Sequence, residues 1–273
     1  MIAPNWTVRA VPIFAGQHNT HIDTGEDYGT CTLADIFAME PGCQPKSKGL
    51  AFLPSTWNGH DARCHAVQRE HGAFVSLTGD IDKGDHPFPV IERLVRQFVG
   101  NAAWLIYSSP HARHRDRRWR AIVPLDVPAP FALWHDAQTA FIDFMEAHGV
   151  TMDRALSRAG QPVYLPNVPR AHQGSGEPLR DRQGAPLHYQ HATTGIAAAG
   201  LRMDVGPVST ALAGLWAQRE ADDGEREHLR AAGERRRASR SADDGESPID
   251  HFNRTNGLAE LLTGTPRYRD RAE

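Results

Sequence analysis

The clearest pattern along the chain is an apolar run that ends in two aspartates. Residues 74–82 read Phe-Val-Ser-Leu-Thr-Gly-Asp-Ile-Asp, with the length and β-branched content of a buried strand. Side chains alternate between the two faces of a strand, so Asp80 and Asp82 should point to the same side. Two close carboxylates repel each other unless a cation lies between them, and hard cations such as Mg²⁺ prefer carboxylate oxygens. Taken alone, the pair also fits a plain turn or an exposed strand edge.

Two further strand-like runs, at 104–107 and 121–125, enclose a strongly basic turn. Its segment 113–120 contains five arginines and no lysine. An arginine fork binds two phosphate oxygens at once, whereas a lysine acts as a point charge. Alternation places Arg118 and Arg120 on one face where the third strand begins, with the intervening tryptophan on the other. The turn therefore suggests a phosphate site, although a solvated hairpin is the simpler interpretation.

Helical periodicity predicts three helices in the first 150 residues. The first has Thr32 as its expected N-cap, and Asp35 stands where a capping box needs an acid. The other two carry apolar stripes at helical spacing, and each is followed by a glycine. Such stripes indicate core packing, and the mixture of strands and helices predicts an α+β or mixed α/β fold. The predicted elements outside the basic turn are a strand at 7–14 and helices at 32–39, 90–99 and 131–148.

Composition and charge narrow the class of protein. The chain has 273 residues, 40% of them apolar and 23% charged, as in ordinary globular domains. No segment approaches a membrane span and the N-terminus lacks a signal-peptide pattern, so we expect a cytoplasmic protein without a membrane partner. Cys31, Cys43 and Cys64 have no paired spacing, so neither a disulfide framework nor zinc is expected. The net charge of −3 does not exclude a local basic face.

The amino-acid composition of the chain changes after about residue 170. Gly, Pro, Gln and His dominate 171–200, and one more helix is predicted at 207–216. From 218 to 247 the segment carries sixteen charges and almost no large apolar residue, which predicts a linker or a solvated helix. Apolar periodicity returns near the end. The predicted organisation is a catalytic domain at 1–170, an extension packed on or following it at 171–217, a charged linker at 218–247 and a short helical segment at 248–273.

The order of these motifs resembles that of the archaeo-eukaryotic primase superfamily, above all the primase-polymerase domains of phages and mobile elements. That family has an apolar strand ending in Asp-x-Asp, then Ser-x-His, then an apolar residue followed by Asp or Glu. All three patterns occur here in order, and the resemblance covers roughly residues 8–170. The matching segments are Gly79-Asp-Ile-Asp82, Ser109-Pro-His111 with Arg118-Trp-Arg120, and Met152-Asp153 ahead of Val163-Tyr-Leu-Pro166.

The resemblance implies both a fold and a site. The fold is an RRM-like sheet joined to an N-terminal α/β module, with a helical C-terminal appendage. The implied catalytic residues Asp80, Asp82 and Asp153 would hold two Mg²⁺ or Mn²⁺ ions. Alternatives to Asp153 are nearby carboxylates, which are Asp126, Asp136 and Asp143. The implied nucleotide-binding residues are Ser109, His111, Arg118 and Arg120.

The expected function is that of a DNA-directed primase-polymerase in DNA replication, acting on single-stranded DNA and nucleoside triphosphates. The alternatives are a catalytically dormant primase-like DNA-binding protein that serves replication initiation, and a metal-dependent nuclease or other nucleotidyltransferase. No phosphate-binding Gly-x-x-x-x-Gly-Lys-Ser/Thr motif is present, so a replicative helicase would be a separate partner. Alternation and its place early in the basic turn suggest that Arg113 faces solvent. The expected DNA-binding residues are Lys46, Lys48, Arg113 and Arg115.

Overall fold

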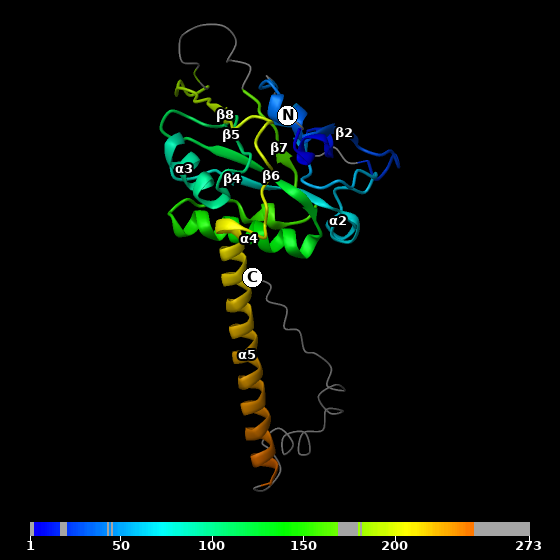
Figure 1. The fold of residues 1–273 in the computed structure, drawn as a ribbon, viewed down its shortest axis with the longest axis vertical. Coiled ribbons are helices and arrows are strands. Elements are labelled where there is room, and N and C mark those ends of the chain that lie inside the picture. The colour runs from blue at the N-terminus through cyan, green and yellow to red at the C-terminus, as the bar shows by residue number, and fades with distance from the viewer. Residues whose placement is uncertain are drawn as a thin grey trace, which may run out of the picture. The chain divides into compact units, whose positions relative to one another are not determined.

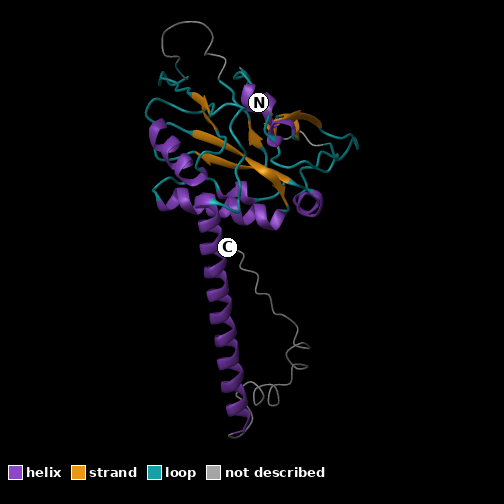
Figure 2. Ribbon diagram, viewed as in Figure 1, coloured by secondary structure: helices purple, strands orange, loops and turns teal. Residues whose placement is uncertain are grey.

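The chain forms a mixed α/β structure with two antiparallel four-stranded sheets and, among the residues described, five α-helices (Figures 1 and 2). The structure is a computed structural model, and it describes residues 3–16, 21–42, 44, 46–168, 180 and 182–242. The chain divides into two units, Met1–Trp216 and Ala217–Glu273. No helix of the described residues is long and apolar enough to cross a membrane.

The first sheet is built mainly from the N-terminal region. Strand β1 (Ala10–Ala15) pairs with both β2 (Gly29–Thr32) and β3 (Leu50–Phe52). Strand β3 also pairs with β7 (Val163–Tyr164), which comes much later in the chain. Helix α1, Leu33–Ala38, follows β2 directly and begins with the predicted capping box between Thr32 and Asp35. The strands of this sheet, in spatial order, are β2 (Gly29–Thr32), β1 (Ala10–Ala15), β3 (Leu50–Phe52) and β7 (Val163–Tyr164).

The second sheet contains the predicted Asp-x-Asp strand. That strand, β4 (Phe74–Ile81), is buried along nearly its whole length, and strand β6 (Trp119–Ala129) lies between it and β5 (Leu105–Ser108). A fourth strand comes from residues beyond 170 and pairs with β5. The sheet therefore uses part of the region that follows the motifs. Its strands, in spatial order, are β4 (Phe74–Ile81), β6 (Trp119–Ala129), β5 (Leu105–Ser108) and β8 (His191–Thr193).

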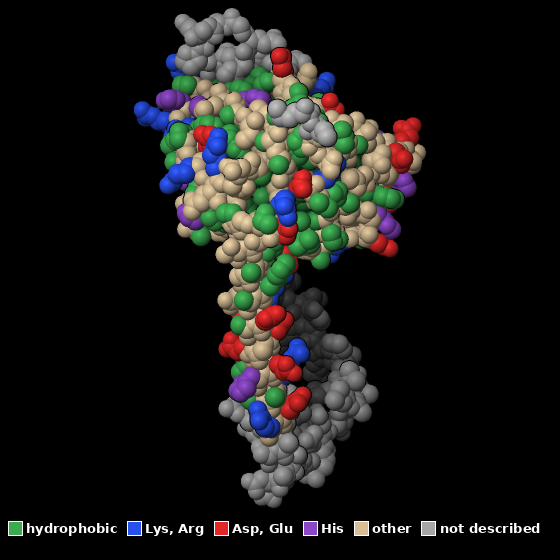
Figure 3. Space-filling model, viewed as in Figure 1, with side chains coloured by type: hydrophobic (Ala, Val, Ile, Leu, Met, Phe, Trp, Pro, Cys, Tyr) green, Lys and Arg blue, Asp and Glu red, His purple; other side chains and the backbone are tan. Residues whose placement is uncertain are grey.

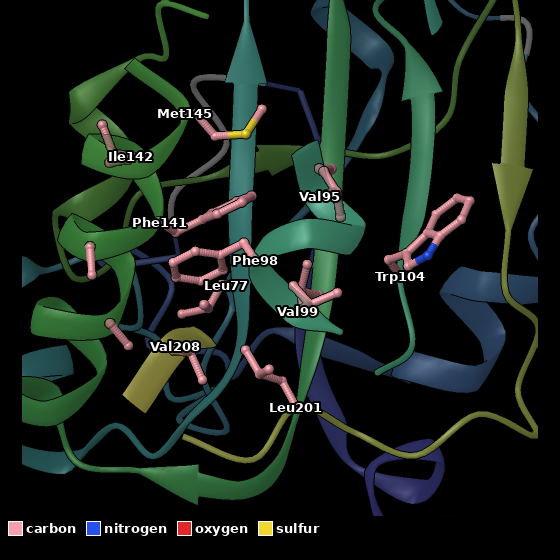
Figure 4. Close-up of a cluster of buried hydrophobic side chains, with 14 of the residues drawn as sticks. Leu77, Val95, Phe98, Val99, Trp104, Phe141, Ile142, Met145, Leu201 and Val208 are labelled. Atoms are coloured by element: carbon pink, nitrogen blue, oxygen red, sulfur yellow. The ribbon is translucent and has the colours of Figure 1, made fainter. Parts of the chain in front are cut away.

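Two helices and the first sheet cover opposite faces of the second sheet. Helices α3 (Phe88–Val99) and α4 (Phe131–Ala147) pack on one face, where Leu77 lies among their aromatic and aliphatic side chains (Figure 4). Val75, on the opposite side of β4, instead lies in a core shared with Phe52 of the first sheet. The register of β4 shifts between Phe74 and Ser76, which places Val75 on the face opposite Leu77. Beyond this irregularity the side chains alternate, so Asp80 also lies on the face opposite Leu77.

Several elements are where the sequence predicts them, and others are not. The three helices of the first 150 residues are confirmed. The predicted opening strand is wrong at its start, because Thr7 and Val8 belong to a 3₁₀ helix, η1 (Asn5–Val8), and β1 begins at Ala10. Helix α2, His65–His71, was not predicted. Two more short 3₁₀ helices are η2 (Lys46–Lys48) and η3 (Arg154–Ser157).

The charged segment near the C-terminus is helical as far as the structure describes it. Helix α5 runs from Gly206 to Ala242, so it includes the predicted helix at 207–216 and continues into the segment expected as a linker or solvated helix. Its residues from 217 to 230 are all exposed, and acidic and basic side chains are spread along it (Figure 3). The predicted segment at 248–273 lies outside the described residues.

Candidate functional site

The first aspartate of the Asp-x-Asp pair is ion-paired to an arginine of the neighbouring strand. Asp80 of β4 stands directly opposite Arg120 of β6 in the sheet register. The Arg120 Nε and Nη2 atoms donate to Asp80 Oδ2 at 3.2 and 3.3 Å. The Arg120 side chain is only 7% exposed and that of Asp80 18%, so the pair is largely removed from water. A buried pair of this kind is costly to break from one side.

The second aspartate faces a second arginine just beyond the ends of the two strands, since Asp82 follows β4 and Arg118 precedes β6. Arg118 Nη1 lies 3.9 Å from Asp82 Oδ1, and its Nη2 donates to Asp116 at 2.8 Å. This pair is more open, because the Asp82 side chain is 51% exposed. The structure thus places Asp80 beside Arg120 and Asp82 near Arg118, and the intervening Trp119 is buried in the core under the helices. Alternation predicts the shared faces from sequence, but not the direct pairing of acids with arginines.

Asp153 lies next to the Asp-x-Asp pair. Its backbone N–H donates to the Asp80 carbonyl oxygen at 2.9 Å, and its carboxylate caps η3 by accepting from Ala155 N at 2.9 Å. Burial raises the pKa of Asp80, Arg120 opposes that shift, and the charges of Asp82 and Asp153 add to it. The carboxylates proposed as alternatives to Asp153 have other contacts. The carboxylate of Asp136 accepts a hydrogen bond from Trp216, and that of Asp143 accepts one from Arg154. The backbone carbonyl oxygen of Asp126 accepts one from Arg9.

The three acids have the donor chemistry for a hard divalent cation. Asp80 Oδ1 is buried, and no described residue hydrogen-bonds to it, so one carboxylate oxygen is left for a ligand. Carboxylate oxygens are the donors that Mg²⁺ and Mn²⁺ prefer. However, no group of three or more His, Cys, Asp or Glu side chains of the described residues is gathered closely enough to hold a metal. The side chains are instead held by Arg118, Arg120 and the N-terminus of η3.

A small pocket beside the acids brings two predicted nucleotide-binding residues together. His111 and Arg120 both line it, although one is in the turn after β5 and the other is on β6. Across the pocket, the ring of Tyr164 from the first sheet lies 5.3 Å from the Arg120 guanidinium carbon. Ser109 is buried, and its hydroxyl accepts a hydrogen bond from His111 N at 3.3 Å, so it shapes this turn. The other lining residues are Gly49, Leu50, Pro110, Leu165 and Asn167.

The basic residues expected to contact DNA lie in different settings. Lys48 is exposed and immediately precedes the pocket residue Gly49, whereas the side chain of Lys46 lies outside the described structure. Arg115 is exposed. Arg113 is partly exposed, and its guanidinium donates to the carbonyl oxygens of His111 and Ala112 at 2.8 and 3.1 Å. Arg113 therefore stabilises the turn that presents His111.

The structure adds residues that the motif analysis missed. Tyr107 stands next to Arg120 in the register on the side away from Asp80, and its hydroxyl donates to the Tyr164 carbonyl oxygen at 2.5 Å. Burial raises the pKa of Tyr107 far above its usual range. In the loop after Asp82, Asp85 accepts from Arg117 Nε at 2.8 Å, and this lowers the pKa of Asp85 to about 2. The Gly84-Asp85 dipeptide predicts a turn, but Arg117, the partner of Asp85, is 32 residues away in the sequence.

Comparisons with known proteins return one structural likeness. No protein-family model matches the chain, and no curated protein matches it. Among solved structures, the chain is similar to the archaeo-eukaryotic primase domain of the cyanophage S-2L primase-polymerase. The TM-score is 0.38 at 10% sequence identity, over 75% of this chain and 88% of that one.

Proposed function

We propose that this chain is a primase-like nucleotidyltransferase that copies single-stranded DNA from nucleoside triphosphates. The observation that carries the proposal is a pair of neighbouring acid–arginine contacts, Asp80 with Arg120 and Asp82 with Arg118. Arg120 also lines a pocket together with His111. Phosphoryl transfer needs carboxylates for metal ions and cations for phosphate oxygens at one place. The resemblance of the sequence motifs to primase-polymerases supports the same function.

Asp80, Asp82 and Asp153 would hold the divalent ions in this mechanism. When bound, such ions lower the pKa of an attacking 3′-hydroxyl and stabilise the leaving pyrophosphate. Without substrate, Arg118 and Arg120 offset the charge of the two strand carboxylates. Phosphate oxygens of a bound nucleotide would replace the carboxylates as partners of Arg118 and Arg120, which would leave the carboxylates available as metal ligands. His111, exposed at the pocket, would orient the triphosphate.

The same exchange gives Arg120 a further role. Its guanidinium is nearly buried and lies against the Tyr164 ring, so its position is fixed before a ligand arrives. A pre-placed cation loses little conformational entropy on binding phosphate. Arg118 is about one-third exposed, and its partners Asp82 and Asp116 are more open than Asp80, so it is less buried than Arg120. Arg120 would therefore fix the position of the triphosphate, and Arg118 would complete its neutralisation.

A primer-extension assay tests the proposal. Primed single-stranded DNA is incubated with labelled ribo- and deoxyribonucleotides and with Mg²⁺ or Mn²⁺, using the wild type, Asp82→Asn and Asp143→Asn. Both variants lose one exposed carboxylate, but only Asp82 belongs to the proposed site. We expect extension by the wild type and Asp143→Asn, and none by Asp82→Asn. Failure of the wild type to extend would favour the dormant protein, and degradation of the DNA would favour a nuclease.

A further inference from the structure

Three arginines and a histidine lie on or next to helix α2 and at the end of η3. His65 and Arg69 are on α2, Arg63 just precedes it, and Arg158 is the residue at which η3 ends. We call these four residues the α2–η3 basic cluster. Arg63 is partly buried, and the other three are exposed.

Close packing holds the two segments of the cluster together. His65 Nδ1 contacts the Ala159 carbonyl oxygen. A Cβ on Gly160 would lie 3.1 Å from the Arg63 carbonyl oxygen, and Gly160 has a φ of +71°. Few side chains tolerate both the crowding and the left-handed backbone, so glycine allows the close approach. Residues that are far apart in sequence thus present their charges at one place.

The charge of the cluster is available to an anion. Within the described part of the chain, neither Arg69 nor Arg158 forms an ion pair, and the Arg69 guanidinium carbon lies 5.1 Å from the centre of the Phe131 ring. Burial lowers the pKa of His65, and the charges of Arg158, Arg69 and Arg63 lower it further. The nearby acid Glu70 lies 3.9 Å from His71, on the same helix. The arginines therefore create a local excess of positive charge, although the whole chain has a net charge of −3.

The cluster adjoins the proposed catalytic site. Asp153 and Arg158 lie at opposite ends of η3, and a 3₁₀ rise of about 2 Å per residue separates their backbones by about 10 Å. A second connection runs through Tyr164. Its ring lies against the Arg120 guanidinium, and both Arg120 and Arg63 oppose the rise that burial causes in its pKa. Positive charge thus continues from the pocket toward α2.

We infer that the α2–η3 basic cluster binds the sugar–phosphate backbone of the single-stranded DNA that enters the site. This inference rests on the proposed function. In the proposed function His111 and Arg120 would contact the triphosphate, whereas the cluster is made of other residues and presents several separate cations. A strand with phosphates at regular spacing can contact such cations together, and their contribution to affinity comes from released counterions.

The test compares two double variants that lose the same charge. Arg69→Ala/Arg158→Ala removes two cations from the cluster, and Arg93→Ala/Arg230→Ala removes two exposed arginines from α3 and α5. Binding of a fluorescent single-stranded oligonucleotide is measured by anisotropy from 0.05 to 0.3 M salt, with EDTA and without nucleotide. Each lost phosphate contact should reduce the salt slope by about 0.7, which is about fivefold in affinity at 0.1 M salt. The cluster variant should therefore bind about 25-fold more weakly, and the control should change by less than about threefold.

Two outcomes would overturn the inference. One is equal affinity and salt slope for the two double variants. The other is a wild type that does not bind the oligonucleotide at low salt. If the cluster variant does not fold, Arg69→Gln and Arg158→Gln are used singly, each with an expected slope change of about 0.7. Failure of the inference is distinct from failure of the proposed function. If only the inference fails, the cluster variant binds DNA as well as the wild type does, the wild type still extends primers and Asp82→Asn does not.

Discussion

The ion pair between Asp80 and Arg120 allows a quantitative prediction about stability. Arg120→Met keeps most of the side-chain volume but removes the guanidinium. The Asp80 carboxylate then remains largely buried beside Asp82 and Asp153, without the cation that now opposes their effect on it. Removing one partner of a buried pair typically costs about 3–5 kcal/mol. Since Asp80 is 18% exposed, we expect the lower end, about 3 kcal/mol at neutral pH.

The loss should depend on pH with a definite sign. The pKa of Asp80 is already raised in the folded protein, and removal of Arg120 should raise it further. A group with a raised folded-state pKa contributes stability below its unfolded pKa, and that contribution is lost as pH rises through the folded value. The deficit of Arg120→Met relative to wild type should therefore be largest at pH 7.5 and shrink toward pH 4.5. Asp80→Asn/Arg120→Met, which contains neither charge, should recover at least about 1.5 kcal/mol at pH 7.5.

Urea unfolding of the wild type, the two single variants and the double variant at both pH values measures this coupling. Neighbouring residues in one pair should show a clear interaction energy, whereas independent sites add within about 0.5 kcal/mol. Additive effects of Asp80→Asn and Arg120→Met, or an equal deficit at pH 7.5 and 4.5, would refute the reasoning.

Three other predictions concern single residues. Asp82→Asn should change the free energy of unfolding by no more than about 1 kcal/mol in urea titrations, because its pair with Arg118 is exposed, while abolishing incorporation. His111→Ala should weaken nucleotide binding about tenfold to a hundredfold by calorimetry, since a charge-assisted phosphate contact contributes roughly 1.5–3 kcal/mol, whereas exposed Arg115→Ala should have little effect. Thr32→Ala should lower stability by about 1 kcal/mol through loss of the capping box, without changing the specific activity of the folded protein.

Elements defined by local signals could be predicted from the sequence. Helix α1 carries its own capping box, and α3 and α4 carry apolar stripes that end at glycines. Strand β4 is predicted by a short run rich in apolar and β-branched residues. The shared face of Asp80 and Asp82 follows from the period of a strand, which needs no knowledge of the neighbours.

Features that depend on distant pairing could not be predicted. Strand β7 has two residues and β8 three, too few for a periodic signal, and each is defined by a partner far away in the chain. The register that sets Arg120 opposite Asp80 arises only when β4 and β6 pair. The arginines of the basic turn look alike in sequence, yet Arg113 holds its own turn and Arg120 holds an acid.

The central claim is that the site transfers nucleotides under the direction of a template. The most direct measurement uses four primed templates that differ only in the first unpaired base, each supplied with one labelled nucleotide at a time and Mn²⁺. We expect the wild type to add the nucleotide that is complementary to the template base, and Asp82→Asn to add none. Addition of the same nucleotide on every template, or no addition by the wild type, would contradict the central claim.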